Sequence, residues 1–313
     1  MIRTAILLGL TLIGAVAWSW LYGPSLEPQQ SELLNHLVTI WAGFTAYTYL
    51  AGVLTGNHSQ VDRLWSTVPI VYAAYAAWFT GWDPRATLMA GLVGLWGARL
   101  TFNFARRGGY SWLPWKGEED YRWEVLRKMA PLNRPMVWQI FHLLFICVYQ
   151  MGLILLFTLP IAYAWRPSGG TSVLTTLDAL LALAMVALIA LEFVADQQQW
   201  NFHQFKKAER AAGREVRPGF LTTGLFSISR HPNFFAEQSQ WWVVYLFVFA
   251  NQGFGGWSWI GAFVLTGLFI GSTRFTEEIT LSKYPDYAQY QKRVSMLVPM
   301  PARNREEDDR ATA

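Results

Sequence analysis

The stretch Leu174–Ala195, LTTLDALLALAMVALIALEFVA, decides the fold of this chain. Its only charged side chains are Asp178 and Glu192, and it is long enough to cross a bilayer, which takes about 20 helical residues. Hydrophobic residues make up 53% of the whole chain and charged residues only 15%, against about 25% charged in soluble domains. The sequence therefore predicts a helical membrane protein.

Further apolar runs resemble this one in length and composition. We expect an all-α, polytopic transmembrane helical bundle of about eight spans. The third and seventh runs are short for the hydrocarbon core. Besides Leu174–Ala195, the expected spans lie near Ile6–Leu21, Leu34–Leu54, Thr67–Phe79, Ala86–Phe104, Met136–Ala164, Glu237–Ala250 and Trp257–Ser272.

The cations of the chain gather in alternate connections between these runs. With eight spans, all but Arg85, Arg99 and Arg166 of the 25 Lys and Arg residues fall on one face. The positive-inside rule then predicts that both termini and the large loops are cytoplasmic. It also explains the net charge of +4 better than nucleic-acid binding does. The single cysteine, Cys147, allows no internal disulfide, and no Cys/His spacing predicts a metal site.

Nine residues at the mouth of the seventh run, Ser229–Glu237 (SRHPNFFAE), hold a cation, an imidazole, a carboxamide and a carboxylate. Polar groups are costly in hydrocarbon unless they are paired, so this cluster predicts a functional site. Arg230 can fork onto a phosphate, and Asn233 and Glu237 lie one turn apart where helix N-terminal amides favour anions. The alternative is a juxtamembrane loop whose charges set only the topology.

Three more polar clusters lie on the same side of the predicted membrane. Glu192 and Asp196 share a helical face and could accept hydrogen bonds from ribose hydroxyls or a carboxamide, or pair structurally with a loop Arg. Residues 116–123 and 274–293 interleave charges with aromatic rings, which suits either stacking on a ligand or anchoring at the headgroups. The clusters predict a large anionic cofactor such as a nucleotide, although no Rossmann or P-loop glycine motif is present.

Two charged residues belong to the membrane interior. Asp62 precedes the third run and Arg99 lies within the fourth. We expect either an ion pair that fixes the spans or polar groups that face a substrate chamber. His36 and His142 stand alone in apolar runs, and we expect local partners to satisfy them.

Several motifs together resemble a known family, over roughly Asp62–Pro299. The chain is similar to the steroid 5-alpha-reductase C-terminal-domain family, and more closely to its bacterial branch of unassigned function. The motifs that carry the resemblance are Gly224–Phe226, Ser229–Glu237, Lys283–Pro285, Leu297–Pro299 and, for the bacterial branch, Glu119–Arg122.

The resemblance implies an NADPH-dependent membrane reductase with a seven-span core, located in a bacterial inner membrane. Residues 1–30 would then be an extra N-terminal transmembrane helix and outer linker, residues 31–301 the reductase-like membrane domain, and residues 302–313 a disordered tail. Asn233 and Glu237 would touch the nicotinamide end of the cofactor. The residues expected at the cofactor are Arg107, Asp120, Tyr121, Arg122, Asp196, Gln199, Gly224, Leu225, Arg230, His231, Asn233, Glu237, Arg274, Glu277 and Tyr284.

The expected reaction is reduction, by NADPH, of a C=C bond conjugated to a carbonyl in a steroid-like or isoprenoid-like lipid. A protonated Asp62 or Arg99 would be the catalytic group that stabilises the developing enolate. The alternative is an S-adenosylmethionine-dependent membrane lipid methyltransferase, because Arg-His-Pro also occurs in isoprenylcysteine methyltransferases. A transporter is disfavoured, since transporters place polar sites at the midplane. The expected partners are a lipidic small molecule and membrane lipids, with no protein partner.

Overall fold

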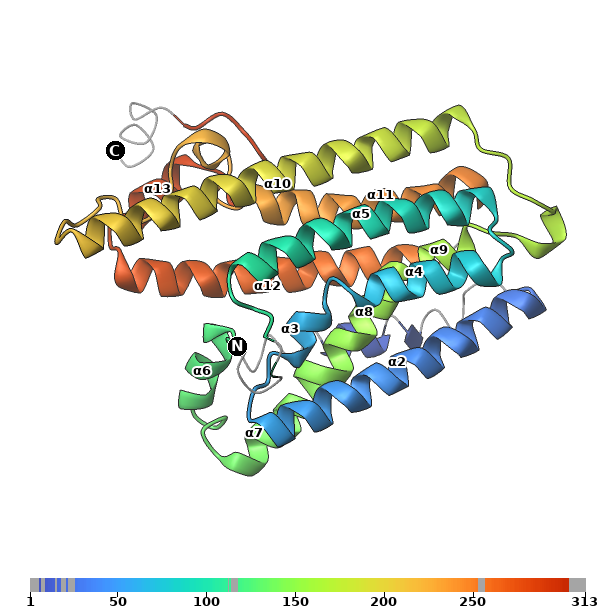
Figure 1. Ribbon diagram of the computed structural model, residues 1–313, viewed down its shortest axis with the longest axis horizontal. Coiled ribbons are helices and arrows are strands. Elements are labelled where there is room, and N and C mark those ends of the chain that lie inside the picture. Colours follow the sequence, from blue (N-terminus) through green and yellow to red (C-terminus); the bar gives the residue numbers. More distant parts are fainter. Residues whose placement is uncertain are drawn as a thin grey trace. The chain divides into compact units, whose positions relative to one another are not determined.

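A computed structural model describes residues 26–111, 113, 118–252 and 257–303, together with residues 6, 9–14, 16–17 and 21 (Figure 1). Residues 7, 8, 15 and 18–20 of the expected first span, and nearly all of the predicted disordered tail, therefore lie outside the described residues. Within the described ranges the chain is helical and contains no strand. This confirms the all-α fold class.

The helices follow the order of the expected spans. Their bounds are α2 Pro28–Thr55, α3 Gln60–Leu64, α4 Val68–Phe79, α5 Pro84–Arg106, α6 Tyr121–Lys128, α7 Pro135–Phe141, the π-helical segment η1 His142–Tyr149, α8 Gln150–Thr158, α9 Pro160–Tyr163, η2 Pro167–Gly169, α10 Thr176–Ala211, η3 Gly224–Ser227, α11 Pro232–Gln252, η4 Trp257–Trp259, α12 Ile260–Lys283 and α13 Tyr287–Arg293.

Three described segments are long and apolar enough to cross a membrane, namely Pro28–Thr55, Pro135–Gly169 and Thr176–Ala211. The last contains all but the first two residues of the stretch Leu174–Ala195, and its helix continues well past Ala195. These segments support a membrane-embedded helical protein. The count of eight spans stays a prediction.

The chain divides into two compact units. Unit 1 consists of residues 1–185 and 241–265, and unit 2 consists of residues 186–240 and 266–313. In unit 1, α4 packs along α5 (Figure 1), where a Cβ on Gly97 would lie 2.6 Å from the Ser66 carbonyl oxygen. Only glycine allows this close approach.

Aromatic rings fill the core of unit 1. The Trp241 ring lies 4.8 Å from Trp96 and 4.1 Å from Phe157, measured between centroids, and all three side chains are fully buried. Edge-on and tilted arrangements of this kind add to the stabilisation from burial.

A buried ion pair joins the first turns of α5 and α10. Arg85 donates to both carboxylate oxygens of Asp178 at 2.8 and 3.0 Å. Asp83 caps α5 by accepting from the Arg85 and Ala86 backbone amides, and it also accepts from the Ser172 amide at 2.7 Å. The charge pattern assigned Arg85 to the outer face. Its side chain has a structural role there, because it pairs with Asp178.

The segment that follows α13 packs against the rest of unit 2. The Arg230 amide donates to the Ser295 carbonyl at 2.8 Å, and the Met300 amide donates to the Ile228 carbonyl at 2.9 Å. The Ser229 hydroxyl donates to the Leu297 carbonyl at 2.7 Å. Residues 294–303 are therefore docked against the loop that leads into α11, and we call them the docked tail.

Candidate functional site

A polar seam runs between α10 and α11 in unit 2. Asn233 Nδ2 donates to Asp196 Oδ1 at 3.1 Å, and Gln240 Nε2 donates to Glu192 Oε2 at 2.7 Å. Glu192, Asp196 and Glu237 are each 4% exposed or less. Glu192 and Asp196 lie one helical turn apart on α10, and Asn233 and Gln240 lie two turns apart on α11, so each pair shares one face of its helix. This buried region between α10 and α11 therefore combines several carboxylates with carboxamide hydrogen-bond donors.

Glu277 of α12 is the hub of a second network in unit 2. Its carboxylate accepts from Arg230 Nε at 2.6 Å, from His231 Nε2 at 2.9 Å and from the Tyr287 hydroxyl at 3.1 Å. Gln291 donates to it as well, at 2.9 Å. Burial alone would raise the pKa of Glu277, but the hydrogen bonds from His231, Arg230 and Gln291 outweigh it and lower the pKa to about 2.

The guanidinium of Arg230 donates hydrogen bonds to other groups of the protein. Besides its two bonds to Glu277, it donates from Nη1 to the Gln291 carbonyl at 2.9 Å and to the Val294 carbonyl. The fork that the sequence offered to a phosphate therefore grips a carboxylate and the docked tail. The consequence is positional, because Arg230 and His231 fix the start of α11 and with it Asn233.

Gly224 is required for two reasons at the turn before this motif. Its φ is +63°, which favours glycine, and a Cβ there would lie 2.6 Å from Gln198 Oε1. The same Gln198 oxygen accepts the Leu225 amide at 2.9 Å. Gln199, the next residue of α10, has a buried Oε1 without a hydrogen-bond partner among the described residues.

The cation–tyrosine contact in unit 2 is also structural. Lys206 Nζ donates to the Tyr284 hydroxyl and to the Gly219 carbonyl, both at 2.6 Å. A Cβ on Gly219 would lie 2.2 Å from the Tyr284 ring. Tyr284 therefore holds the loop before the motif against the end of α12. Arg274, also predicted at the cofactor, is exposed.

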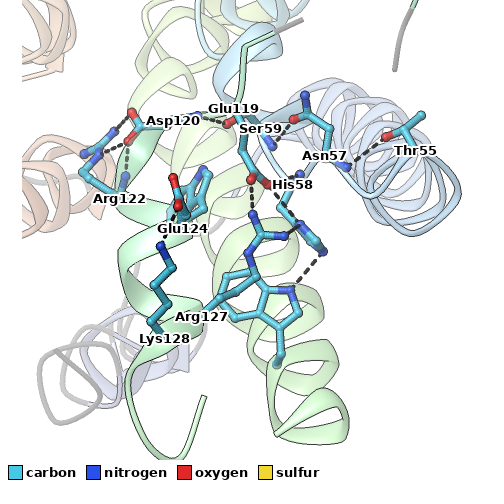
Figure 2. A network of polar contacts seen from close by, with 12 residues as sticks. Thr55, Asn57, His58, Ser59, Glu119, Asp120, Arg122, Glu124, Arg127 and Lys128 are labelled. Atoms are coloured by element: carbon cyan, nitrogen blue, oxygen red, sulfur yellow. Dashed lines mark hydrogen bonds and ion pairs between the residues drawn. The ribbon is translucent and has the colours of Figure 1, made fainter. Parts of the chain in front are cut away.

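A separate polar network lies in unit 1 (Figure 2). Glu119 accepts from the His58 backbone amide at 2.8 Å and lies 3.1 Å from His58 Nδ1, and it also accepts from Arg127. The Trp138 indole donates to His58 Nε2 at 3.0 Å. Since Nε2 must accept this bond, the ring proton sits on Nδ1 and is donated to Glu119. Burial raises the pKa of Glu119, but bonds from His58 and the charge of Arg127 lower it overall.

Asp120 caps the N-terminus of α6 and pairs with Arg122 in a bidentate contact at 2.9 and 2.8 Å (Figure 2). The nearby Asp62 carboxylate accepts from the Trp123 indole at 2.8 Å. Burial and repulsion by Asp120 raise the pKa of Asp62, only partly offset by Arg122 and by hydrogen bonds. The predicted catalytic Asp62 therefore adjoins the predicted cofactor residues Asp120 and Arg122.

The remaining predicted residues of unit 1 are more scattered. Arg99 is buried within α5, whereas Arg107 and Tyr121 are exposed. Their roles at a cofactor stay predictions.

The two isolated histidines differ from each other. His36 Nδ1 lies 2.9 Å from the Tyr75 hydroxyl, as expected. The prediction that a local partner satisfies His142 is wrong. Its side chain is fully buried, and neither ring nitrogen has a hydrogen-bond partner among the described residues. The rings of His58 and Tyr49 and the backbone at Gly52 surround it instead.

Sequence reasoning missed His58, Trp138 and Arg127. They come from three separate segments and carry no local motif. The one available signal was the turn Asn57-His58-Ser59, since short polar side chains at turns bond neighbouring amides. The Ser59 amide indeed donates to Asn57 Oδ1 at 3.0 Å.

A family model described as a protein of unknown function (DUF1295) matches residues 48–294. The chain belongs to this family. The family is associated with steroid 5-alpha-reductase-like proteins, which agrees with the motifs Gly224–Phe226 and Ser229–Glu237 of this chain. An uncharacterized protein of Schizosaccharomyces pombe (strain 972 / ATCC 24843), C594.04c, is 36% identical over 269 residues, covering 79% of this chain and 74% of that protein. No solved structure matches.

Proposed function

We propose that this protein is an NADPH-dependent membrane oxidoreductase that reduces a C=C bond conjugated to a carbonyl in a lipidic substrate. The observation that carries the proposal is the Asp196–Asn233 pair at the start of α11, held in place by the Arg230–Glu277 lock. A carboxylate beside a carboxamide presents both an acceptor and a donor edge. That combination suits the carboxamide of a nicotinamide ring.

The residues of unit 2 fit such a cofactor in two further respects. Gln199 Oε1 is a buried acceptor without a partner among the described residues, and a ribose hydroxyl would satisfy it. Lys207, Arg210 and Arg274 are exposed cations that can meet phosphates. These residues would hold NADPH, which when bound supplies a hydride.

The chain itself must supply the proton. Asp62 suits this task, because burial and repulsion by Asp120 raise its pKa and keep a proton on its carboxyl group at higher pH. Trp123 fixes the orientation of that carboxyl group by donating to Oδ2. Arg99 is the second candidate for stabilising developing negative charge. We assign the proton to Asp62 first.

The test is the thermal stability of the purified protein in detergent with NADPH, NADH or S-adenosylmethionine. A ligand that binds only the folded state raises the melting temperature, and we expect NADPH to do so most. Asn233→Ala should weaken NADPH binding about tenfold, equivalent to about 1.4 kcal/mol. Gln204→Ala, which removes an exposed amide of α10, is the control. Wild-type protein that NADPH does not stabilise would refute the proposal.

The second candidate is an S-adenosylmethionine-dependent lipid methyltransferase. It is favoured by the buried carboxylates of the seam, Glu192, Asp196 and Glu237, because they would attract a cationic sulfonium. Stabilisation by S-adenosylmethionine and not by NADPH would select it. In that case Asp196→Asn, which removes one of these charges, should weaken binding more than Asn233→Ala does.

A further inference from the structure

The docked tail exposes apolar side chains on the surface of unit 2. Val298 and Met300 are 47% and 52% exposed, and Ile228, in the loop before α11, is 37% exposed. The Met300 amide donates to the Ile228 carbonyl at 2.9 Å, so these two residues are neighbours in space. Apolar side chains that are grouped on a surface indicate contact with a partner or with a membrane.

Three cations accompany these apolar side chains. Lys292 and Arg293 end α13, and the Arg303 amide donates to the Arg293 carbonyl at 3.0 Å, which brings the end of the docked tail back to α13. All three side chains are exposed, and none pairs with a carboxylate among the described residues. Residues 287–303 contain no Asp or Glu, so this surface is basic as well as apolar. We call its six residues the tail patch, namely Ile228, Lys292, Arg293, Val298, Met300 and Arg303.

Hydrogen bonds to α10 give the level of the tail patch relative to the apolar run of that helix. The Leu225 amide donates to Gln198 Oε1 at 2.9 Å, and Asn233 Nδ2 donates to Asp196. At 1.5 Å of rise per residue, Gln198 lies about 5 Å past Ala195, where the apolar run ends. The headgroup layer on each side of a bilayer is about 5–8 Å thick. The loop before α11, and the tail docked on it, therefore lie level with the headgroups.

The chemistry of the tail patch defines its partner. Apolar side chains gain by leaving water for hydrocarbon, and exposed cations gain by meeting anions. An anionic phospholipid leaflet offers both at this level, since its negative headgroups cover the acyl chains. The run Glu306–Asp309 of the same chain is also anionic, but it has no apolar side chain that would cover Val298 and Met300.

We propose that the tail patch is a membrane-contact surface for an anionic phospholipid leaflet. Ile228, Val298 and Met300 insert among the headgroups, and the three cations pair with lipid phosphates. The leaflet is then a second anchor of the docked tail, besides the hydrogen bonds to the loop before α11. This contact goes beyond the proposed function and does not depend on it, because neither NADPH nor a substrate takes part.

The test places a fluorophore beside the tail patch without changing it. Exposed Ala302→Cys, in a Cys147→Ala background, carries the environment-sensitive fluorophore NBD. The full chain is reconstituted without NADPH in nanodiscs of phosphatidylcholine, or of phosphatidylcholine and phosphatidylglycerol in equal parts. In the anionic nanodiscs we expect emission at shorter wavelength and stronger quenching by spin-labelled lipid. High salt should reduce this difference, because it screens the attraction between exposed charges.

The charge contribution is tested with two matched double variants. Arg293→Gln, Arg303→Gln should abolish the difference between the nanodiscs, since each arginine near an anionic leaflet favours the bound segment about fivefold. Arg214→Gln, Arg217→Gln removes the same charge after the end of α10, a helix that continues roughly 24 Å past its apolar run. Arg214 and Arg217 already pair with carboxylates, and their loss should leave the difference intact.

The apolar contribution is tested with Val298→Ser, Met300→Ser. Both side chains are exposed, so the melting temperature should stay the same, whereas quenching by spin-labelled lipid should fall in both kinds of nanodisc. Unchanged quenching in this variant would show that the two side chains do not enter the leaflet, and the proposal would then be wrong.

Two further results would overturn the proposal. The first is equal emission and quenching of the wild-type patch in the neutral and the anionic nanodiscs. The second is a response to phosphatidylglycerol that appears only after the acidic run is neutralised by Glu306→Gln, Glu307→Gln, Asp308→Asn and Asp309→Asn. That result would assign the cations of the tail patch to the acidic run of the same chain.

Discussion

Glu277 shows how a single buried carboxylate can hold several segments of a chain. It accepts from Arg230 and His231 of the loop before α11 and from Tyr287 and Gln291 of α13. Breaking such a buried pair from one side leaves an uncompensated charge, which costs about 3–5 kcal/mol. The stability of unit 2 should therefore depend on the ionisation of this one group.

The pKa of Glu277 predicts how that stability changes with pH. Its folded-state pKa of about 2 lies below the ordinary value of 4.5, so the contribution is present above pH 4.5 and is lost as the pH falls toward 2. The difference corresponds to on the order of 3 kcal/mol. Glu277→Gln should lower the melting temperature at pH 7 and flatten its decline between pH 4.5 and 3. Glu278→Gln, its exposed neighbour, should do neither.

Residue identity alone did not predict these roles. Arg230 was expected at a phosphate because the guanidinium fork fits one, but its carboxylate partner lies 47 residues away in sequence. His142 was expected to find a local partner, yet its surroundings are the faces of other rings and a glycine backbone. In both cases the deciding neighbour comes from a distant segment, which a local pattern does not contain.

At the scale of elements, α2 meets the π-helical segment η1 at a glycine. A Cβ on Gly52 would lie 2.6 Å from His142 Cε1 and 2.7 Å from Nε2. The absent side chain on α2 thus makes room for a whole imidazole. The π-helical segment begins at His142 itself, and such segments frequently occur at functional sites.

Gly52→Ala tests this contact. Overpacking of a closed core typically costs about 1–3 kcal/mol, so the melting temperature of the purified protein should fall. The cost should shrink in a His142→Ala background, since the clash is then gone. Gly43→Ala on the same helix is the control, because a Cβ there meets nothing within 4 Å. Equal costs for Gly52→Ala in both backgrounds would contradict the contact.

The sequence predicted the existence of helices better than their extent. The run Leu174–Ala195 was read as one span, but α10 continues to Ala211 because no Gly or Pro interrupts it before Gly213. The Glu192–Asp196 face was visible from spacing, whereas the pairing of those residues with Gln240 and Asn233 required the packing of α11. The periodicity of a sequence predicts which residues share a face of one helix, but not which helix packs against that face.

At the scale of the whole molecule, the distribution of cations predicts which face is cytoplasmic. In a background without the native cysteine (Cys147→Ala), a cysteine at exposed Thr171 should react with a membrane-impermeant maleimide added outside intact cells. A cysteine at exposed Ser282 should react only after the cells are opened. Labelling of both positions from outside would contradict the predicted topology and the even number of spans.

The docked tail has a consequence for when unit 2 can complete its fold during synthesis of the chain. The ribosome makes Asp196 and Asn233 long before it makes Glu277, Gln291 and the carbonyls of residues 294–297 that anchor Arg230 and Ser229. Until those later residues are synthesised, Arg230 lacks its counter-ion Glu277, and the loop before α11 lacks the carbonyl groups to which it donates hydrogen bonds. An interrupted translation product would therefore contain the residues of the seam without the contacts that hold the loop before α11 in place.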